Sequence, residues 1–413
     1  MWMHVDMNSY FASVEQQANP FLRSRPVGVC AYLNDYGCII ASSIEAKLRG
    51  VKTGCRVPEA RRRCPELVLV ENDPKKYRSS TKKIFSILAD YTDQIEPYSI
   101  DEAFFRINSF GDDKESLSTL RDLAEEIKKR VREEVGEWLR CSIGIAPTRW
   151  LAKIGSDFQK PDGLTVLTLE NISSIYDRMK LTDAWGIGDR LEDRLNRLWI
   201  YTLNELRTYP VANIMEVMGL QGYQLWANVN GIESTSLSPH LFTSSPLAKS
   251  IGHSYCLPRS VQDPENARKI LMKLCEKTAR RLRNDGREAW AMSCVWSSRS
   301  GGNSRNKRYG VPLWDTQELF REALQLVGGS FAFPVEFLAI TVMDLRVSSG
   351  QLSLWEEKVH QRDKDLTSAI DYINNQYGEY ALMRGSMWGM QEFAHDRIGF
   401  RKTVRVERST KEP

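Results

Sequence analysis

The sequence lacks the features that mark several large classes of protein. Its eight cysteines form no C-x-x-C pair and, with five histidines, no cluster with zinc-ligand spacing, so a zinc-stabilised fold is not expected. A chain of 413 residues is also too large to need a disulfide framework. No apolar run approaches the roughly 18 residues of a membrane-spanning helix, and Asp6 interrupts the N-terminus before a signal-peptide core could form. We therefore predict a soluble, cytoplasmic protein with reduced thiols.

The apolar and charged content is that of a soluble protein with real hydrophobic cores. Hydrophobic residues make up 42% and charged residues 27% of the chain, and a chain of this length is expected to form two to four domains. The net charge is only +4, but residues 247–346 contain 16 Lys and Arg against 10 Asp and Glu. The distribution of charge is therefore more informative than its sum.

The order of strand-like and helical segments predicts an α+β fold. A first apolar strand ends near Asp6. The segments that follow are a helix at 75–91, strand-like residues on both sides of Asp101 and Glu102, a helix at 117–135, a strand at 141–146 and a helix at 149–158. This order indicates a split βαβ sheet of ferredoxin-like type. Residues 23–72, with a hairpin signal at 34–37, look like an insertion into it.

The second half of the chain indicates a helical region, a linker and another α/β unit. Residues 168–232 are mostly helical, and residues 233–246 are rich in Ser, Thr and Pro, which is typical of a linker. Strand-like and helical runs then alternate at 250–257, 264–284, 288–297, 316–327 and 335–345. The tail contains one helix-like run, at 365–377, and a charged end that we expect to fray.

Residues 97–105, PYSIDEAFF, place two carboxylates side by side. Adjacent side chains of a regular strand point to opposite faces, but at a tight turn between strands both can project from the same end of the sheet. If the strand ending at Asp6 is a neighbour, then Asp6, Asp101 and Glu102 converge. Oxygen ligands of this kind suit Mg²⁺, and two such ions about 3.5–4 Å apart form a two-metal site for phosphoryl transfer. The residues alone leave a solvated acidic surface open as an alternative.

Three segments resemble, in order and separation, the motifs of Y-family translesion DNA polymerases. They are VDMNSYFASVE, YSIDEAFF and GIAPTRWLAKIGSDFQKPDG (residues 144–163), and the similarity extends over about residues 3–346. The resemblance implies a right-hand fold and a template-directed, low-fidelity DNA polymerase. Such an enzyme adds dNTPs to a primer 3′-hydroxyl across damaged template and releases pyrophosphate. Asp6, Asp101 and Glu102 would ligate two Mg²⁺ ions, which Mn²⁺ can replace, with the main-chain carbonyl of Met7.

The resemblance also implies how the chain divides into domains. The palm would comprise residues 1–10 and 73–167, the fingers 11–72, a helix-hairpin-helix thumb 168–232, the linker 233–246, a DNA-binding little finger 247–346 and a tail 347–413. The fingers segment is short, so we expect it to check the shape of the new base pair poorly and to admit damaged templates. Nothing in the sequence suggests a separate proofreading domain.

Four residues are expected to contact the incoming nucleotide if the resemblance holds. Phe11, next to Tyr10, aligns with the steric gate, a flat ring that leaves no room for a ribose 2′-hydroxyl. Lys160 and Lys47 would contact the triphosphate as point charges, with main-chain amides near Tyr10. At the position where a DinB-branch enzyme usually carries a phosphate-binding Tyr, this chain has Ile44. Residues 34–54 therefore resemble the UmuC branch more closely. Without the motif, the aromatics would be core residues and the lysines surface charges.

Two regions are expected to hold DNA. In AWGIGDRLEDRLNRL (184–198), Gly186 and Gly188 would free the backbone to approach a phosphate at a helix N-terminus, as in a helix-hairpin-helix. The basic little finger, with Lys249, Arg280 and Arg281, would bind the duplex backbone electrostatically. A solvated amphipathic helix is the alternative for the basic residues.

The peptide after the little finger resembles a clamp-binding motif. Gln351, Leu352, Leu354 and Trp355 match the Q-L-x-L-F peptide by which bacterial polymerases dock on the sliding clamp, with Trp in place of Phe. A chance match or a strand is the alternative. The implied partners are primer-template DNA, dNTPs, a sliding clamp and possible accessory subunits.

Two other functions remain open from the sequence. A DNA-bound accessory or scaffold subunit could keep the polymerase fold without activity, although it would have no need to hold three repelling acids together. Another palm-type nucleotidyltransferase, such as a cyclase, would not need a hairpin-helix and a basic little finger. The sequence does not indicate which lesions are bypassed.

Overall fold

The computed structural model describes residues 1–107, 113–233, 248–298, 301–328, 334–348, 357–378 and 380–388. It divides into two compact units, with the main break at Pro246–Leu247. Within the described ranges, no helix has both the length and the apolar content needed to cross a bilayer.

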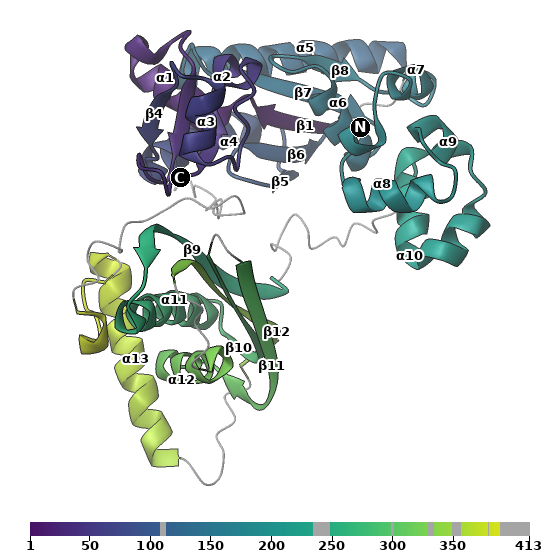
Figure 1. The fold of residues 1–413 in the computed structure, drawn as a ribbon. Coiled ribbons are helices and arrows are strands. Elements are labelled where there is room, and N and C mark those ends of the chain that lie inside the picture. Colours follow the sequence, from purple (N-terminus) through teal and green to yellow (C-terminus); the bar gives the residue numbers. More distant parts are fainter. Residues whose placement is uncertain are drawn as a thin grey trace, which may run out of the picture. The chain divides into compact units, whose positions relative to one another are not determined.

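A five-stranded sheet forms the centre of the first unit (Figure 1). Its order is β5-β6-β1-β7-β8, where the strands are β1 (Trp2–Met7), β5 (Ile95–Pro97), β6 (Glu102–Arg106), β7 (Cys141–Ala146) and β8 (Leu164–Val166). Strand β1 lies in the middle and runs antiparallel to both β6 and β7. The ferredoxin-like arrangement of strands is the predicted one. Strand β8, parallel to β7, was not predicted because three residues after a turn carry no periodicity.

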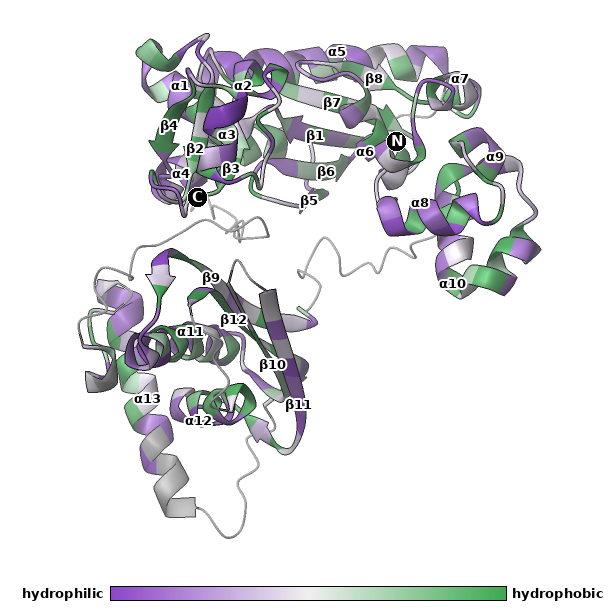
Figure 2. Cartoon of the chain, viewed as in Figure 1, coloured by the Kyte–Doolittle hydropathy of each residue, from purple (hydrophilic) through white to green (hydrophobic). Residues whose placement is uncertain are grey.

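Helices cover both faces of this sheet. On one face, α4 (Pro74–Ala89) and α5 (Lys114–Arg130), continued by the π-helical turn Val131–Val135, pack on Met3, Val5 and Phe105. On the other face, α6 (Arg149–Phe158) packs on Trp2 and Phe104. Figure 2 shows that α5 is largely hydrophilic on its outer side. The alternating side chains of the strands therefore contribute to two separate cores.

A smaller sheet is inserted after the first helix. It has the order β3-β2-β4, and its segment contains α1 (Tyr10–Ala18), the 3₁₀ turn Pro20–Leu22, β2 (Val27–Cys30), β3 (Ile39–Ser42), α2 (Ile44–Leu48), α3 (Val57–Arg63) and β4 (Val68–Glu71). The predicted hairpin is present, since β2 and β3 pair antiparallel. Strand β4, which pairs parallel with β2, was not predicted.

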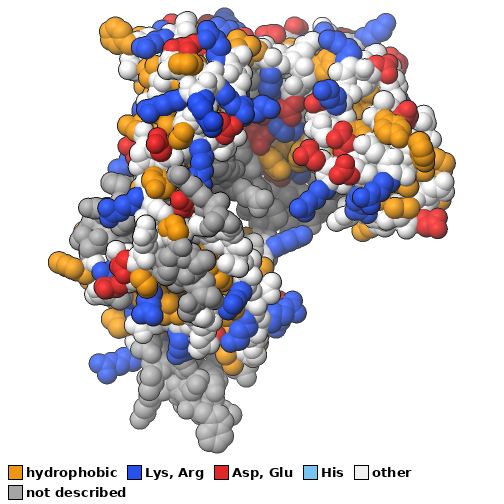
Figure 3. Space-filling view, viewed as in Figure 1, with side chains coloured by type: hydrophobic (Ala, Val, Ile, Leu, Met, Phe, Trp, Pro, Cys, Tyr) orange, Lys and Arg blue, Asp and Glu red, His pale blue; other side chains and the backbone are white. Residues whose placement is uncertain are grey.

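A group of helices follows the main sheet and shares a core with it. It consists of α7 (Ile172–Tyr176), the 3₁₀ turn Leu181–Asp183, α8 (Asp189–Asn196), α9 (Leu203–Thr208) and α10 (Val211–Val229), which is kinked at Gly219. Apolar residues of these helices and of α6 form one buried cluster. The same region exposes large apolar side chains, including Trp199 between α8 and α9 and Leu220 of α10; orange side chains are visible at the right of Figure 3.

The second unit is a four-stranded sheet with helices on one face. The order is β11-β10-β12-β9, and the elements are β9 (Ser250–Val261), α11 (Pro264–Asn284), β10 (Arg287–Ser298), β11 (Gly301–Leu313), α12 (Thr316–Val327), β12 (Val335–Val347), α13 (Glu357–Tyr377) and the 3₁₀ turn Gly385–Met387. The edge strand β11 was not predicted because it is almost wholly exposed and lacks alternation. Helix α13 begins earlier than predicted, and its Asp371 accepts two hydrogen bonds, of 2.6 and 2.9 Å, from Arg283 of α11.

Candidate active site

Strand register brings the three predicted acids to one end of the main sheet. Asp6 lies directly opposite Glu102 in the β1–β6 pair. The backbone N–H groups of Tyr98 and Ser99 both donate to the Glu102 carbonyl, at 3.0 and 3.1 Å, and so close the turn that contains Asp101. The Met7 N–H donates to the Asp101 carbonyl at 2.9 Å. The hairpin thus holds both members of the Asp-Glu pair beside the end of β1.

A lysine that the sequence analysis did not single out lies between these acids. The Lys153 ammonium, on α6, is 3.0 Å from Asp6 Oδ2, 2.8 Å from Glu102 Oε2 and 3.4 Å from Asp157 Oδ2. Lys160 lies nearby, 3.0 Å from Asp6 Oδ1 and 2.7 Å from Asp157 Oδ1. The sequence contained one indication of this cluster: Lys153, Asp157 and Lys160 are spaced i, i+4 and i+7, and residues at this spacing lie on the same side of a helix.

His4 is a second residue that the sequence analysis missed. Its Nε2 lies 3.3 Å from Glu102 Oε2, and its Nδ1 lies 2.7 Å from Ser156 Oγ on α6. Burial lowers the pKa of His4, so the neutral ring is favoured. Its i, i+2 spacing with Asp6 on β1 puts both side chains on the same face, which was the signal in the sequence.

The three acids differ in ionisation because their neighbours differ. Burial opposes the ionisation of Asp6, but Lys153 and Lys160 outweigh it and lower the pKa of this carboxyl group. Burial also opposes the ionisation of Glu102, whose pKa is lowered by His4 and Lys153. Asp101 shows the opposite shift, because burial and repulsion from Asp6 raise its pKa to about 6. The Ser99 hydroxyl donates to its carboxylate. Asp101 is thus the acid that is least compensated.

The donor set fits a divalent cation. Ligand atoms of His4, Asp6 and Glu102 all lie within 4.8 Å of one another, and Asp101 adjoins them in the turn. Clustered carboxylate oxygens are hard ligands, and a set of acids whose charges exceed those of the nearby lysines attracts a cation.

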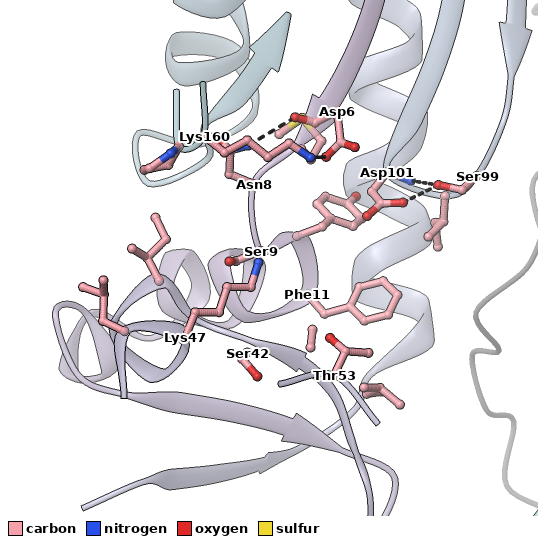
Figure 4. Close-up of a pocket in the computed structure, with 18 residues that line it drawn as sticks. Asp6, Asn8, Ser9, Phe11, Ser42, Lys47, Thr53, Ser99, Asp101 and Lys160 are labelled. Carbon is pink, nitrogen blue, oxygen red and sulfur yellow. Dashed lines mark hydrogen bonds and ion pairs between the residues drawn. The ribbon is translucent and has the colours of Figure 1, made fainter. Parts of the chain in front are cut away.

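A cavity of about 510 Å³ opens beside the acids (Figure 4). It is lined by Asp6, Met7, Asn8, Ser9, Tyr10, Phe11, Ile40, Ala41, Ser42, Ile44, Lys47, Leu48, Thr53, Ser99, Ile100, Asp101, Lys160 and Pro161. All four residues predicted to contact a nucleotide are therefore in its wall. The main sheet supplies the acids, and the inserted segment supplies the opposite wall.

The predicted gate residue is held by a tyrosine from α4. The ring of Phe11 stacks on that of Tyr77, with centroids 4.4 Å apart and an angle of 16° between the planes. The Tyr77 hydroxyl donates to Glu15 at 2.7 Å. Tyr10 uses its own hydroxyl inside the core, 2.9 Å from both the Tyr77 carbonyl and Thr81. Tyr10 therefore contributes to the pocket through its backbone and ring, and Phe11 through its ring.

Two features of the pocket suit an anion. Helix α1 begins at Tyr10, so the unpaired N–H groups of its first turn lie at the pocket wall. Burial, and then the neighbouring Lys160, lower the pKa of Lys47, while Asp6 and Asp101 oppose this shift. Two ammonium groups, those of Lys47 and Lys160, thus belong to the pocket wall. Ile44 lines the wall with an apolar side chain.

The residues predicted to hold DNA differ in their exposure. Gly186 has a φ of 92°, and neither it nor Gly188, the residue preceding α8, has an atom within 4 Å of where a Cβ would lie. Lys249 and Arg281 are exposed. Arg280 is only 6% exposed because α11 is packed against the sheet and α12. The prediction of a phosphate contact by Arg280 is therefore poorly supported.

The four clamp-motif residues Gln351, Leu352, Leu354 and Trp355 lie outside the described residues, as does most of the predicted linker 233–246. The tail that follows contains α13, which packs on the second unit.

Fold and site together define the class of the protein: an α+β nucleotidyltransferase whose acids lie at the end of two central strands, beside a pocket lined by Lys47 and Lys160. A solved structure, a Y-family DNA polymerase chimera of Dbh and Dpo4, matches the fold with a TM-score of 0.69 and 22% identity, covering 84% of this chain and 99% of that one. The model of the impB/mucB/samB family matches residues 5–157, and that of its C-terminal domain matches residues 248–354.

Curated relatives point to the same family over nearly the whole chain. The DNA polymerase IV of Pelotomaculum thermopropionicum is 32% identical, covering 92% of this chain and 93% of its own. DNA polymerase IV 1 of Bacillus subtilis is 30% identical over 97% and 96%. The DNA polymerase IV of Moorella thermoacetica is 38% identical, covering 68% of this chain and 69% of its own. None of these names supports the closer relation to the UmuC branch suggested by residues 34–54.

The chain belongs to the impB/mucB/samB family of Y-family DNA polymerases, and it is a DNA-directed DNA polymerase. Members of this family use divalent metal ions, which is consistent with the donor set at Asp6 and Glu102.

Proposed function

We propose that this protein performs translesion synthesis, adding dNTPs to a primer 3′-hydroxyl opposite damaged template. The observation that carries the proposal is the convergence of Asp6, Asp101 and Glu102 beside a pocket that also contains Phe11 and Lys160. In this proposal the 3′-hydroxyl and the α-phosphate would react beside the acids, and the triphosphate would extend towards Lys160.

Two Mg²⁺ ions are the proposed cofactors, with Mn²⁺ able to replace them. Asp6, Asp101 and the Met7 carbonyl would hold one, and Asp6, Asp101 and Glu102 the other. When bound, such ions lower the pKa of an attacking hydroxyl and stabilise the charge of departing pyrophosphate. The hairpin turn and the β1–β6 register fix the backbone positions of the acids beforehand.

The triphosphate is proposed to lie between α1 and the two pocket lysines. The first-turn N–H groups of α1 favour an anion, and Lys47 and Lys160 supply two point charges. Because burial lowers the pKa of Lys47, a bound phosphate would restore it. Lys47→Met should raise KM for dNTP more than it lowers kcat, since the contact is made before and during the reaction.

Sugar selection is assigned to Phe11, backed by Tyr77. The stacked pair leaves the Phe11 ring little freedom to move away from a 2′-hydroxyl. A Phe11→Ala enzyme should incorporate ribonucleotides at least tenfold better relative to dNTPs, as measured by the ratio of the two kcat/KM values, and unchanged selectivity would show that Phe11 is not the gate.

Low fidelity is proposed to follow from the small wall over the new base pair. Ala41 and Ser42 line the pocket there, and the segment that carries them is a three-stranded sheet with short helices. Small side chains leave room for a bulky adduct, at the cost of checking pair shape.

The domains are proposed with the boundaries implied by the family. The turn at Gly186 and Gly188 would contact a phosphate through the backbone, although Asp189 and Glu192 in the first turn of α8 oppose an anion. Lys249 and Arg281 are the better candidates in the little finger. Residues 351–355 are proposed to bind a sliding clamp, and accessory subunits and a cytoplasmic location remain parts of the proposal.

Primer extension tests the main proposal. Full-length protein should extend a primed template with Mg²⁺ and pass a bulky or abasic site, while Asp101→Ala should not extend either template. Arg130→Met, which removes a cation paired with Asp90 and Glu134 and outside the pocket wall, is a control that should still extend. If wild type does not extend, the non-catalytic alternative is correct. If Asp101→Ala extends as well as wild type, Asp101 is not part of the catalytic site and the proposed site is wrong.

A further inference from the structure

Lys153 is placed as a shared counter-ion of the catalytic acids. Its ammonium has three N–H donors, and three carboxylates from three elements surround it: Asp6 of β1 at 3.0 Å, Glu102 of β6 at 2.8 Å and Asp157 of α6 at 3.4 Å. Its side chain is 12% exposed, so solvent screens these contacts little. Lys153 is a residue of α6, and the packing of this helix on the sheet fixes the position of its backbone.

The contacts of Lys153 use oxygens that a metal ion would need. Lys153 takes Asp6 Oδ2 and Glu102 Oε2, and Lys160 takes Asp6 Oδ1. Both oxygens of Asp6 are therefore occupied by ammonium groups. Asp101, in contrast, accepts from the neutral Ser99 hydroxyl. The positive charge is thus concentrated on two of the three acids.

We propose that Lys153 is a positioning residue that holds Asp6 and Glu102 in ligating positions before metal binds and limits the affinity of the nucleotide-free site for metal. This inference rests on the proposed function, in which the acids are the metal ligands. A fixed positive charge about 3 Å from two ligands opposes a divalent cation whether or not the ammonium moves aside when the ion arrives. It also prevents the acids from repelling one another apart.

The position of Lys160 would couple metal binding by the acids to nucleotide binding in the pocket. Lys160 lines the pocket, whereas Lys153 is not among the residues in its wall. A triphosphate in the pocket would attract Lys160 and release Asp6 Oδ1, so nucleotide and metal would each strengthen the binding of the other. The site would then fill with metal mainly when a nucleotide is present, while Lys153 keeps the acids in place.

Direct metal binding, without DNA or nucleotide, tests the role of Lys153. Mn²⁺ titrations followed by electron paramagnetic resonance, and Mg²⁺ calorimetry, would compare wild type with Lys153→Met, which keeps the length of the side chain and removes its charge. We expect Lys153→Met to bind Mn²⁺ at least tenfold more tightly. Lys153→Arg, which keeps the charge, should stay within about threefold of wild type. Arg283→Met, which removes a cation that is 13% exposed from the ion pair with Asp371 in the second unit, should not change the affinity.

Thermal unfolding in a chelator provides a second measurement. Lys153→Met should melt at a lower temperature than wild type without metal, and excess Mg²⁺ should raise its melting temperature by more than it raises that of wild type. A merely structural lysine would lower the melting temperature equally with and without metal. If Lys153→Met folds poorly, Lys153→Gln offers the same charge removal with a polar end.

Asp6→Asn separates the failure of this inference from that of the proposed function. Where Asp6→Asn weakens Mn²⁺ binding but Lys153→Met leaves it unchanged or weaker, the counter-ion role is wrong and the metal ligands stand. Where Asp6→Asn leaves Mn²⁺ binding unchanged, the metal lies elsewhere and both proposals fail.

Discussion

Helix α6 carries two buried cations one turn apart, and they sit in opposite surroundings. Arg149 donates to Glu96 at 2.7 Å, and the two side chains are 15% and 7% exposed. Lys153 contacts Glu102 at 2.8 Å, with 12% and 14% exposed. Burial therefore does not distinguish them. One pair is an element of the fold, and the other belongs to the catalytic site.

Arg149 and Lys153 differ in the charge of their neighbours and in whether aromatic rings surround them. Around the Arg149 guanidinium, the Glu96 carboxylate is joined by aromatic rings: the guanidinium carbon lies 4.3 Å from the centroid of Phe104, 5.7 Å from Tyr98 and 5.9 Å from Trp185. Such rings favour a cation and exclude water. A second acid, Glu233, accepts from the backbone N–H of Arg149 at 3.2 Å.

Around Lys153, by contrast, three acids face two ammonium groups, those of Lys153 and Lys160, and one of the acids, Asp6, also lines an open pocket. A cluster with more acids than cations can accept a metal ion, whereas a balanced pair closed by rings cannot. Charge balance, rather than burial, thus marks the functional site.

The largest expected effect is on catalysis, and it should appear at only one of the two clusters. Asp101→Asn should lower kcat/KM for dNTP incorporation by about a thousandfold or more, since it removes a charged ligand at the reacting centre. Glu96→Gln should keep the activity of each folded molecule within a few-fold of wild type. Single-turnover incorporation, normalised to the folded fraction, measures both. A thousandfold loss in Glu96→Gln would mean that the two clusters share a catalytic role.

The next effect is on stability, and it should appear at the other cluster. Arg149→Met leaves Glu96 without its guanidinium in a buried site, which should lower the free energy of unfolding by about 3–5 kcal/mol. Replacing both residues with Met should recover much of this loss, because a buried ion pair contributes little more than an apolar pair of similar size. Urea unfolding at equilibrium gives both values. An equal loss in the single and double variants would contradict this account.

The sequence was sufficient for the acids but not for their counter-ions. Asp6, Asp101 and Glu102 lie in contiguous motifs, and strand register alone brings them together. Lys153 lies within the third of the polymerase-like motifs, but a lysine on an amphipathic helix is usually a surface charge, and only the packing of α6 against β1 and β7 buries it. For Arg280 the charge pattern of α11 suggested a basic face, but the side chain is only 6% exposed in the structure; its contact with DNA stays a prediction.

Three strands, β4, β8 and β11, were not predicted from the sequence, for a related reason. Strands β4 and β8 are short, and the edge strand β11 is exposed, so none has the alternation that marks a half-buried strand. Their positions are set by hydrogen bonds to a neighbour, β2, β7 or β10, rather than by their own side chains.

A smaller effect, the pH dependence of stability, should distinguish Asp101 from Asp6 and Glu102. Folding raises its pKa from 3.8 to about 6, so the stability it confers is present at low pH and is lost as the pH rises towards 6. Asp6 and Glu102, whose pKa values are lowered from 3.8 and 4.5, have the opposite sign: their stabilisation is present at neutral pH and is lost in acid.

Asp101→Asn should therefore stabilise the metal-free protein at pH 7.5, by roughly 2 kcal/mol, and this gain should shrink towards pH 4.5. Urea unfolding with a chelator at several pH values measures it. A gain that does not depend on pH would assign the effect to packing rather than to charge. Asp101→Asn would thus abolish activity and raise stability. Glu96→Gln would neither abolish activity nor raise stability.

The smallest expected effect concerns one ring of the Arg149 surroundings. Trp185 meets Tyr98 edge to face at 5.7 Å, and it precedes the Gly186 turn that is proposed to contact DNA. Trp185→Leu keeps an apolar side chain and should lower the free energy of unfolding by about 0.5–2 kcal/mol. If the cluster serves only the fold, the affinity for primer-template DNA at fixed salt should stay within twofold, as measured by fluorescence anisotropy. A loss of DNA affinity beyond the loss of folded protein would instead show that the rings position the turn, because Tyr98 and Trp185 belong to the segments that carry Asp101 and Gly186.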